Sequence, residues 1–341
     1  MPQAVSDRAL CFMRMRNCVA IDPMTGETLW VRRDVRPGSS VFGDHEYIFI
    51  VPPEDNTATV LRAADGQKLG DRPLPPQRLA TFGRRVLVWR QSFTESVLEM
   101  IDAWEGTRIW TPRQFAPESQ VHLIDDQTAA VFEPGGRFVL VGLDDGRAII
   151  DATLEPEPRL SKVRVFRSPE QYLLVIAADH GESPVERRVY PIHGTTSEQI
   201  PRGRVYAFDG SGRSLWEKPA TIKDQFLPVD QPARLPVLVF AGMVQERKPG
   251  GQIETATQIQ AIDKRTGRLV CDQQFSGASA LFRVSGNPAG KTVEIQSHQN
   301  MITLTFTDRP LPPASEEATA GKKTTPMQAV LEALRKAAIG P

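Results

Sequence analysis

Residues 18–31 read CVAIDPMTGETLWV, and variants of this stretch return along the whole chain. The glycines of the first four copies, Gly26, Gly66, Gly106 and Gly146, are each 40 residues apart. Two further copies, RVYAFDGSGRSLWE around Gly212 and IQAIDKRTGRLVCD around Gly267, follow after gaps of 66 and 55 residues. A constant period near 40 residues is typical of an array of small supersecondary units.

The residues that flank these glycines predict a β-hairpin. Five residues before and three residues after each glycine, all six copies carry an apolar side chain. Asp, Ser, Thr or Glu directly precedes each glycine, and glycine adopts the positive φ that closes such a turn without a Cβ clash. Between hairpins, short β-rich runs separated by Gly, Pro or Asp supply four strands per period, which predicts an all-β β-propeller of four-stranded antiparallel blades.

Strand counting leaves the number of blades open. The segments predict three strands at the start, five four-stranded blades, and three strands at the end, so seven blades are favoured and six or an incomplete eight also fit. We expect three regions: the propeller at 1–308, a Pro-, Ala- and charge-rich linker at 309–324, and a short amphipathic C-terminal helix at 325–341.

Two insertions break the period. About 26 extra residues fall within Asp179–Arg202, which predicts a polar loop or an extra hairpin, and the second addition falls near Gln245–Thr257. Insertions in a propeller map to loops on one face, where binding commonly diversifies. We therefore expect the partner-facing surface in these two segments and in the helix at Pro326–Ala338.

Composition excludes several classes of function. The chain has 41 basic and 41 acidic residues among 341, so its net charge does not attract nucleic acid. No apolar run is long enough to span a membrane, and the first residues do not resemble a signal peptide, so the compartment stays open. Cys11, Cys18 and Cys271 are expected to be buried free thiols, and the five histidines share no metal-ligand spacing, which predicts no bound metal: His45, His122, His180, His193 and His298.

The pattern Ala-x-Asp-x-x-Thr-Gly-x-x-x-Trp resembles the repeat of pyrroloquinoline-quinone-like (PQQ-like) propellers. Residues 19–30 match it almost fully, and three later copies match it in part. The resemblance implies that the tryptophans of the repeat dock against the adjoining blade, and that Gly70, Ile150 and Cys271 take this position in the other blades. The structural repeat residues are Gly26, Gly66, Gly106, Gly146, Gly212, Gly267, Trp30, Trp110, Trp216, Asp22, Asp102 and Asp263.

This family contains quinone-dependent dehydrogenases and non-catalytic members. The chain has no adjacent cysteines, is shorter than those enzymes, and uses its repeat aspartates as hairpin caps, so we expect no enzyme activity and no cofactor. Its composition, rich in Arg and Pro, resembles the C-terminal propeller region of large planctomycete proteins. That resemblance implies a bacterial scaffold for protein–protein interaction that is part of a larger or envelope-anchored assembly. We expect an unknown protein partner, no nucleic acid, no membrane insertion and a monomer. The alternative is a degenerate enzyme or small-ligand sensor that uses the axial funnel.

Overall fold

The computed structural model describes residues 4–5, 9–33, 35–179, 187–192, 195–247, 251–277, 282–287, 289–297 and 300–306. This part of the chain is all-β, as the repeat predicts, and its strands form antiparallel sheets. The expected linker at 309–324 and helix at 325–341 lie outside the described residues.

The first four sheets follow the 40-residue period, and each contains four consecutive strands in chain order. In each of these sheets a repeat glycine lies between the third and fourth strands. The first sheet contains β1 (Ala4–Val5), β2 (Leu10–Arg14), β3 (Asn17–Ile21) and β4 (Thr28–Arg32); the second β5 (Ser40–Gly43), β6 (Tyr47–Val51), β7 (Thr57–Arg62) and β8 (Lys68–Pro73); the third β9 (Arg78–Phe82), β10 (Arg85–Gln91), β11 (Ser96–Asp102) and β12 (Arg113–Phe115); the fourth β13 (Gln120–Leu123), β14 (Thr128–Phe132), β15 (Arg137–Gly142) and β16 (Ala148–Thr153).

The remaining sheets contain the insertions. In the fifth sheet the strand order is β17-β18-β20-β21, in the sixth β19-β22-β23-β24, and in the seventh β25-β26-β27. Their bounds are β17 (Leu160–Arg167), β18 (Tyr172–Ala178), β19 (Arg187–Tyr190), β20 (Ser197–Phe208), β21 (Ala220–Pro228), β22 (Val237–Arg247), β23 (Ile253–Asp263), β24 (Leu269–Ser276), β25 (Phe282–Asn287), β26 (Thr292–Ser297) and β27 (Asn300–Thr305).

The described parts of both insertions contribute strands to the sheets. β19, from the first insertion, leaves the fifth sheet and pairs with β22 of the sixth, with Val189 opposite Val244. The second insertion lengthens β22 and β23 to 11 residues each, and this extension supplies the edge that β19 covers. Gly242 makes the approach possible, because a Cβ there would lie 2.8 Å from Val189 Cγ1. The two segments therefore assemble with each other.

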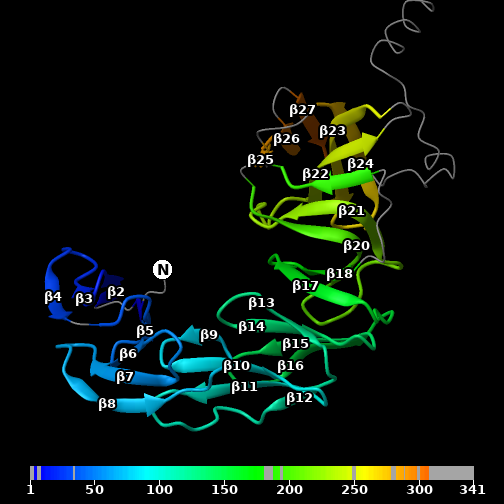
Figure 1. Cartoon of the computed structure of the whole chain (residues 1–341). Helices are drawn as coiled ribbons and strands as arrows, with labels where there is room; N and C mark the ends of the chain where they lie inside the picture. Colours follow the sequence, from blue (N-terminus) through cyan, green and yellow to red (C-terminus); the bar gives the residue numbers. More distant parts are fainter. Residues whose placement is uncertain are drawn as a thin grey trace, which may run out of the picture.

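The first sheet also differs from expectation. The sequence predicted three strands at the start of the chain, but the two-residue strand β1 pairs with β2 and makes this sheet four-stranded. The described strands number 27 as a result. In Figure 1 the seven sheets follow one another along an open arc, with the first and seventh sheets at its two ends. The number of blades in a closed ring stays a prediction.

The core is divided among the junctions between sheets. In the described residues six apolar clusters occur, one between each pair of successive sheets. The free cysteines Cys11 and Cys18 belong to the first junction and Cys271 to the last, and all three are buried. Burial raises the pKa of the Cys11 thiol to about 12, so this group stays protonated and packs as an apolar side chain. Each sheet is thus stabilised by its neighbours.

Candidate functional site: an arginine–aromatic stack between two sheets

The six repeat glycines lie in the hairpins between the third and fourth strands of the first six sheets, with φ between 69° and 87°. Asp22 caps its turn, since its Oδ1 accepts hydrogen bonds from the N–H groups of Met24 (2.7 Å) and Thr25 (3.0 Å). These donors lower the pKa of Asp22. Asp102 and Asp263 accept the same bond from the residue two positions on. The turn at Gly212 is one residue tighter and is capped by Asp209 instead: Ser211 N–H to Asp209 Oδ1, 2.9 Å.

Three junctions carry a docked tryptophan. Trp30, Trp110 and Trp216 are buried, and each ring packs on the repeat glycine of the following sheet. A Cβ added at that glycine would lie 2.6–2.7 Å from the ring. Each indole Nε1 also donates to a backbone carbonyl in the following sheet, at 2.8–3.1 Å. Ring, glycine and carbonyl form one unit that aligns successive sheets, because aromatic burial is combined with a satisfied N–H donor.

The junction between the second and third sheets lacks this unit. Gly70 stands where Trp30 and Trp110 stand in their sheets, and a Cβ added at Gly106 would meet no atom within 4 Å. At this junction Trp104 of the third sheet packs back onto the second sheet, whereas Trp30, Trp110 and Trp216 pack onto the sheet that follows their own. It lies in the turn after β11 in the third sheet and stacks on Tyr47 of β6 in the second, with ring centroids 4.7 Å apart and planes 16° apart.

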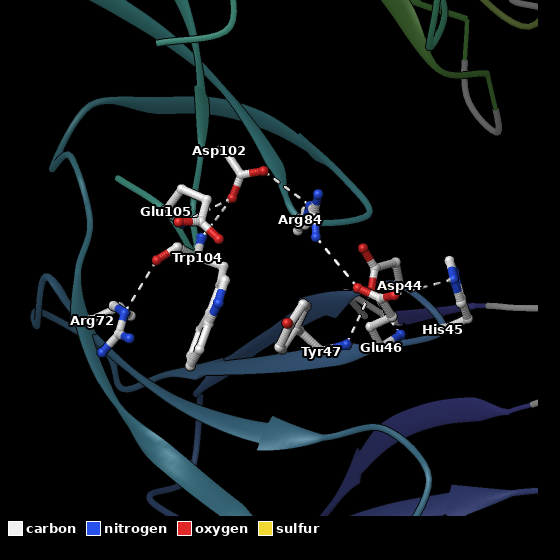
Figure 2. Close-up of polar contacts among 9 residues, drawn as sticks. All are labelled: Asp44, His45, Glu46, Tyr47, Arg72, Arg84, Asp102, Trp104 and Glu105. Atoms are coloured by element: carbon white, nitrogen blue, oxygen red, sulfur yellow. Dashed lines mark hydrogen bonds and ion pairs between the residues drawn. The ribbon is translucent and has the colours of Figure 1, made fainter. Parts of the chain in front are cut away.

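Two arginines extend these rings into a four-layer stack, which we call the Arg–aromatic stack: Arg72, Trp104, Tyr47 and Arg84 (Figure 2). The Arg72 guanidinium lies 4.1 Å from the Trp104 ring centroid, and its Nε donates to the Trp104 carbonyl at 3.1 Å. Arg84 lies 5.9 Å from the Tyr47 ring. Cations on aromatic faces at these distances are attracted by the ring quadrupole.

The two ends of the stack differ in charge balance. Arg84 is neutralised, because its Nε lies 2.9 Å from Asp102 Oδ2 and its Nη1 lies 3.4 Å from Glu46 Oε2. Arg72 donates to the backbone carbonyls of Trp104 and Asp71, and within the described part of the chain it has no carboxylate partner. The stack therefore presents one guanidinium that is held in place but not paired with an acid.

A groove of about 420 Å³ runs beside the stack. Its lining includes Tyr47 and Trp104 from the stack, Arg62 and Leu69 from the second sheet, and Glu46. The turn that carries Glu46 is rigid, since Asp44 Oδ1 accepts the N–H groups of Glu46 (2.8 Å) and Tyr47 (2.9 Å). The Tyr47 and Trp104 side chains are half-buried, so the groove combines apolar area from these two rings with fixed charges.

A second polar cluster joins β13 of the fourth sheet to β17 and β20 of the fifth. His122 Nδ1 accepts the Val165 N–H at 3.1 Å, and burial lowers the pKa of His122 to about 4. Arg164 forms a two-pronged ion pair with Glu198. Burial alone would raise the pKa of Glu198, but the hydrogen bond and charge of Arg164, with Lys162, hold it below its usual value. These groups satisfy one another, so the cluster ties the two sheets together.

Among the described residues, no three His, Cys, Asp or Glu side chains are grouped as a metal site, and no helix is long and apolar enough to cross a membrane. His180, His193 and His298 lie outside these residues. His45 lies at the edge of the groove, 3.9 Å from Glu46.

Residues 4–179 match the sequence model of a protein family that is described as outer membrane protein assembly factor BamB. The chain belongs to this family of PQQ-like repeat propellers. A search of curated proteins gave no match.

Solved structures that this chain matches include BamB from Moraxella catarrhalis, 13% identical, with a TM-score of 0.35 over 91% of this chain and 84% of that one. The N-terminal domain of Nup159 is 10% identical, with a TM-score of 0.38 over 89% and 88%. The computationally designed Ika8 protein is 12% identical, with a TM-score of 0.36 over 89% and 95%.

Sequence reasoning did not find the Arg–aromatic stack, because Trp104 and Tyr47 are far apart in the chain and come from different sheets. A signal was nevertheless present. Gly70 departs from the repeat at the docking position, and Trp104 occupies a turn position held by Met24, Ala64 and Asp144 in the first, second and fourth sheets. A missing tryptophan followed by a displaced one marks this junction.

Proposed function

We propose that this chain is a non-catalytic propeller scaffold that binds a protein partner through the groove beside the Arg–aromatic stack. The observation that carries the proposal is the stack itself, at the junction where Gly70 stands in place of the docking tryptophan and a half-buried aromatic pair is present instead. Support also comes from the family, whose model is described as an assembly factor for outer membrane proteins.

The residue types of the groove are those that supply most binding energy in protein interfaces. Tryptophan, tyrosine and arginine are enriched among hot-spot residues, in well-packed and desolvated pockets. Here Tyr47 and Trp104 already hold each other in place, so a partner does not have to order them on binding. Pre-organised side chains reduce the entropy cost of association by about 0.5–1.5 kcal/mol for each side chain.

The charge pattern indicates the chemistry of the partner. Arg72 keeps a planar fork of donors on the Trp104 face, and carboxylates bind such forks in a two-pronged geometry. Arg62 lines the groove, whereas Arg72 lies beside it on the Trp104 ring; Arg62 is exposed and pairs with Asp65. We therefore infer a partner segment that places an apolar side chain against the ring edges of Tyr47 and Trp104 in the groove and an acidic side chain on Arg72.

The test is affinity capture with the tagged chain in cells that express it, followed by binding measurements on each captured protein. Arg72→Glu reverses the charge at the proposed contact, and Trp104→Ala removes the central ring. Arg147→Glu is the matched control, because it makes the same charge change on a highly exposed side chain of the fourth sheet. We expect a partner that Arg147→Glu retains and that both stack variants bind at least tenfold more weakly.

A partner that binds Arg72→Glu as tightly as the wild type would contradict the role of the groove. The non-catalytic part of the proposal is tested separately. The purified chain should not bind pyrroloquinoline quinone in the presence of Ca²⁺. It should also not reduce a dye when alcohols or sugars are supplied as substrates. A measurable turnover would instead favour the axial funnel as a site.

A further inference from the structure

The outer rim of the third sheet differs from the rims of the sheets beside it. In the second and fourth sheets the residue five positions after the repeat glycine is an exposed aspartate, Asp71 or Asp151, which pairs with a basic side chain of its own sheet. The third sheet has Thr111 at this position. Its outer strand also leaves β11 over residues 110–112, so Glu99 of β11 has no residue of β12 opposite it. This rim therefore lacks both the acidic side chain and the strand pairing of its neighbours.

The residue opposite this departure is a buried acid. Glu99 stands between Leu98 and Met100, which both pack toward the fourth sheet, so its side chain points toward the second sheet. Only 3% of the Glu99 side chain is exposed. At the same distance before the repeat glycine, the first, second, fourth and sixth sheets have uncharged residues: Val19, Thr59, Val139 and Gln260. Among these sheets, the third alone carries a charge at this position.

Two arginines bind the two oxygens of this carboxylate. Arg90 Nη2 lies 3.0 Å from Glu99 Oε1, and Arg108 Nε lies 3.0 Å from Glu99 Oε2. The arginine side chains are 46% and 60% exposed, so both guanidiniums reach solvent. Neither has a second acidic partner within the part of the chain that the structure describes. The three groups carry one positive charge in excess, and the N–H groups that do not face Glu99 remain available as donors.

Stability alone does not account for this arrangement. Burial of a carboxylate is costly even when it is paired, and apolar residues of similar volume commonly give equal or greater stability. Val139 shows that the repeat accepts an apolar residue at the position of Glu99. A buried acid that is bound by two exposed bases fixes the orientation of both, because each guanidinium is held by a charge-assisted hydrogen bond. Such an arrangement suits the recognition of an anionic group.

The arginine pair borders the same junction as the Arg–aromatic stack. Glu99 points toward the second sheet, and Arg72 of that sheet donates to the Trp104 carbonyl in the third. Trp104 precedes Arg108 by four residues and lies in the turn that leads to it. Arg72, Arg90 and Arg108 therefore bring three guanidiniums to the junction between the second and third sheets, with Glu99 as the buried acid of the arginine pair.

We propose that Arg90 and Arg108 form a clamp for a carboxylate of an acidic peptide segment, and that Glu99 is the positioning residue that orients both guanidiniums. The inference rests on the proposed function, because it extends the acidic contact at Arg72 to a second point on the same junction. Guanidinium forks bind carboxylates in a two-pronged geometry. One carboxylate neutralises the excess charge of the clamp, whereas a phosphorylated side chain brings about −1.5 to −2 charges at neutral pH.

The experiment is a titration of a dye-labelled hexaglutamate peptide with the full chain, followed by fluorescence anisotropy at low ionic strength. A hexaglutamine peptide with the same dye is the blank. The wild type should bind hexaglutamate roughly tenfold more tightly than hexaglutamine. Equal dissociation constants for the two peptides would overturn the proposal.

Two variants change the charge of the clamp in opposite directions. Arg108→Ala removes a positive charge, and Glu99→Val removes the negative one. Both should weaken hexaglutamate binding by roughly threefold or more, because the first removes donors and the second releases both guanidiniums from their fixed orientation. Circular dichroism should show both folded, since Ala148 and Val139 occupy the equivalent positions of the fourth sheet. Unchanged or tighter binding by Glu99→Val would show that net charge attracts the peptide, and would overturn the clamp.

Arg147→Ala is the matched control, because it removes the same charge from an arginine of the fourth sheet whose side chain is 88% exposed. The dissociation constant for hexaglutamate should stay within about twofold of the wild-type value. A loss equal to that of Arg108→Ala would show non-specific attraction and contradict the clamp. Competition by succinate and by inorganic phosphate, at equal ionic strength, identifies the oxyanion. Succinate should displace the peptide at the lower concentration, and the reverse order would contradict a carboxylate site.

The outcome can be separated from that of the groove. Hexaglutamate binding that Trp104→Ala retains and Arg108→Ala loses would support the clamp without the aromatic rings. A captured partner that Trp104→Ala loses and Arg108→Ala retains would overturn the clamp and leave the groove as the binding site.

Discussion

Replacing Gly146 by alanine tests how the docked tryptophans align the sheets. The added Cβ would lie 2.6 Å from Cδ2 of Trp110, so the ring must move away from the hairpin. Gly106 offers the matched control, because it has the same φ of 69° and a Cβ there meets nothing within 4 Å. The difference between the two variants isolates the cost of displacing the ring from the cost of the backbone conformation.

The magnitudes follow from these contacts. Alanine in the left-handed region costs roughly 1–2 kcal/mol, and this is the whole effect expected for Gly106→Ala. Gly146→Ala should cost about 1–3 kcal/mol more, as overpacking in a close-packed core does. Trp110→Ala removes a buried ring and leaves the Leu143 carbonyl without its donor, so we expect a loss of roughly 3–5 kcal/mol.

Urea unfolding followed by circular dichroism measures all three variants and the double variant Trp110→Ala/Gly146→Ala. Once the ring is absent, Gly146→Ala should cost no more than Gly106→Ala does in the wild type. The reasoning is refuted if Gly146→Ala and Gly106→Ala cost the same in the presence of Trp110, since the ring would then not depend on the glycine.

Three further predictions concern single junctions. Because the pKa of His122 is lowered to about 4, the unfolded chain takes up a proton at a higher pH than the folded chain does. The free energy of unfolding should therefore fall as the pH drops from 6.5 to about 4. His122→Asn should flatten that slope when urea unfolding is measured over this pH range. Lys264 is buried and burial lowers its pKa to about 8, so its charge destabilises the fold below pH 8. Lys264→Met should raise the free energy of unfolding by roughly 1–3 kcal/mol at pH 7. The same variant should remove the rise in stability that the wild type shows between pH 8 and about 10. Gly242→Val should push Val189 and β19 off β22, which hydrogen exchange would detect as faster exchange along β19, whereas Gly135→Val, with open space around its Cβ, should not.

The sequence was sufficient to predict the sheets because each hairpin is a local structure. A glycine at positive φ, an aspartate cap and apolar positions at fixed offsets all lie within about twelve residues, so the pattern can be read without knowledge of the neighbours. The repeat of that unit then predicts antiparallel four-stranded sheets. β1 was missed because two residues, Ala4 and Val5, carry no periodic signal.

Strand exchange and the stack could not be predicted in the same way, since both depend on contacts between segments far apart in the chain. No sequence feature of residues 187–190 indicates that they pair with residues 243–246. Period-two alternation specifies the two faces of a strand but not the strand with which it pairs. Similarly, Trp104 is expected to be exposed as a turn residue, and its stacking on Tyr47 joins segments from two different sheets.

The proposed partner groove rests on a residue that departs from the repeat while the surrounding backbone keeps to it. Trp104 stands where the first, second and fourth sheets carry Met24, Ala64 and Asp144, so the turn itself does not require tryptophan. The junction between the second and third sheets does use the ring, because Trp104 stacks there on Tyr47. Urea unfolding of Trp104→Ala therefore has to show a folded chain before a loss of partner binding is assigned to the surface.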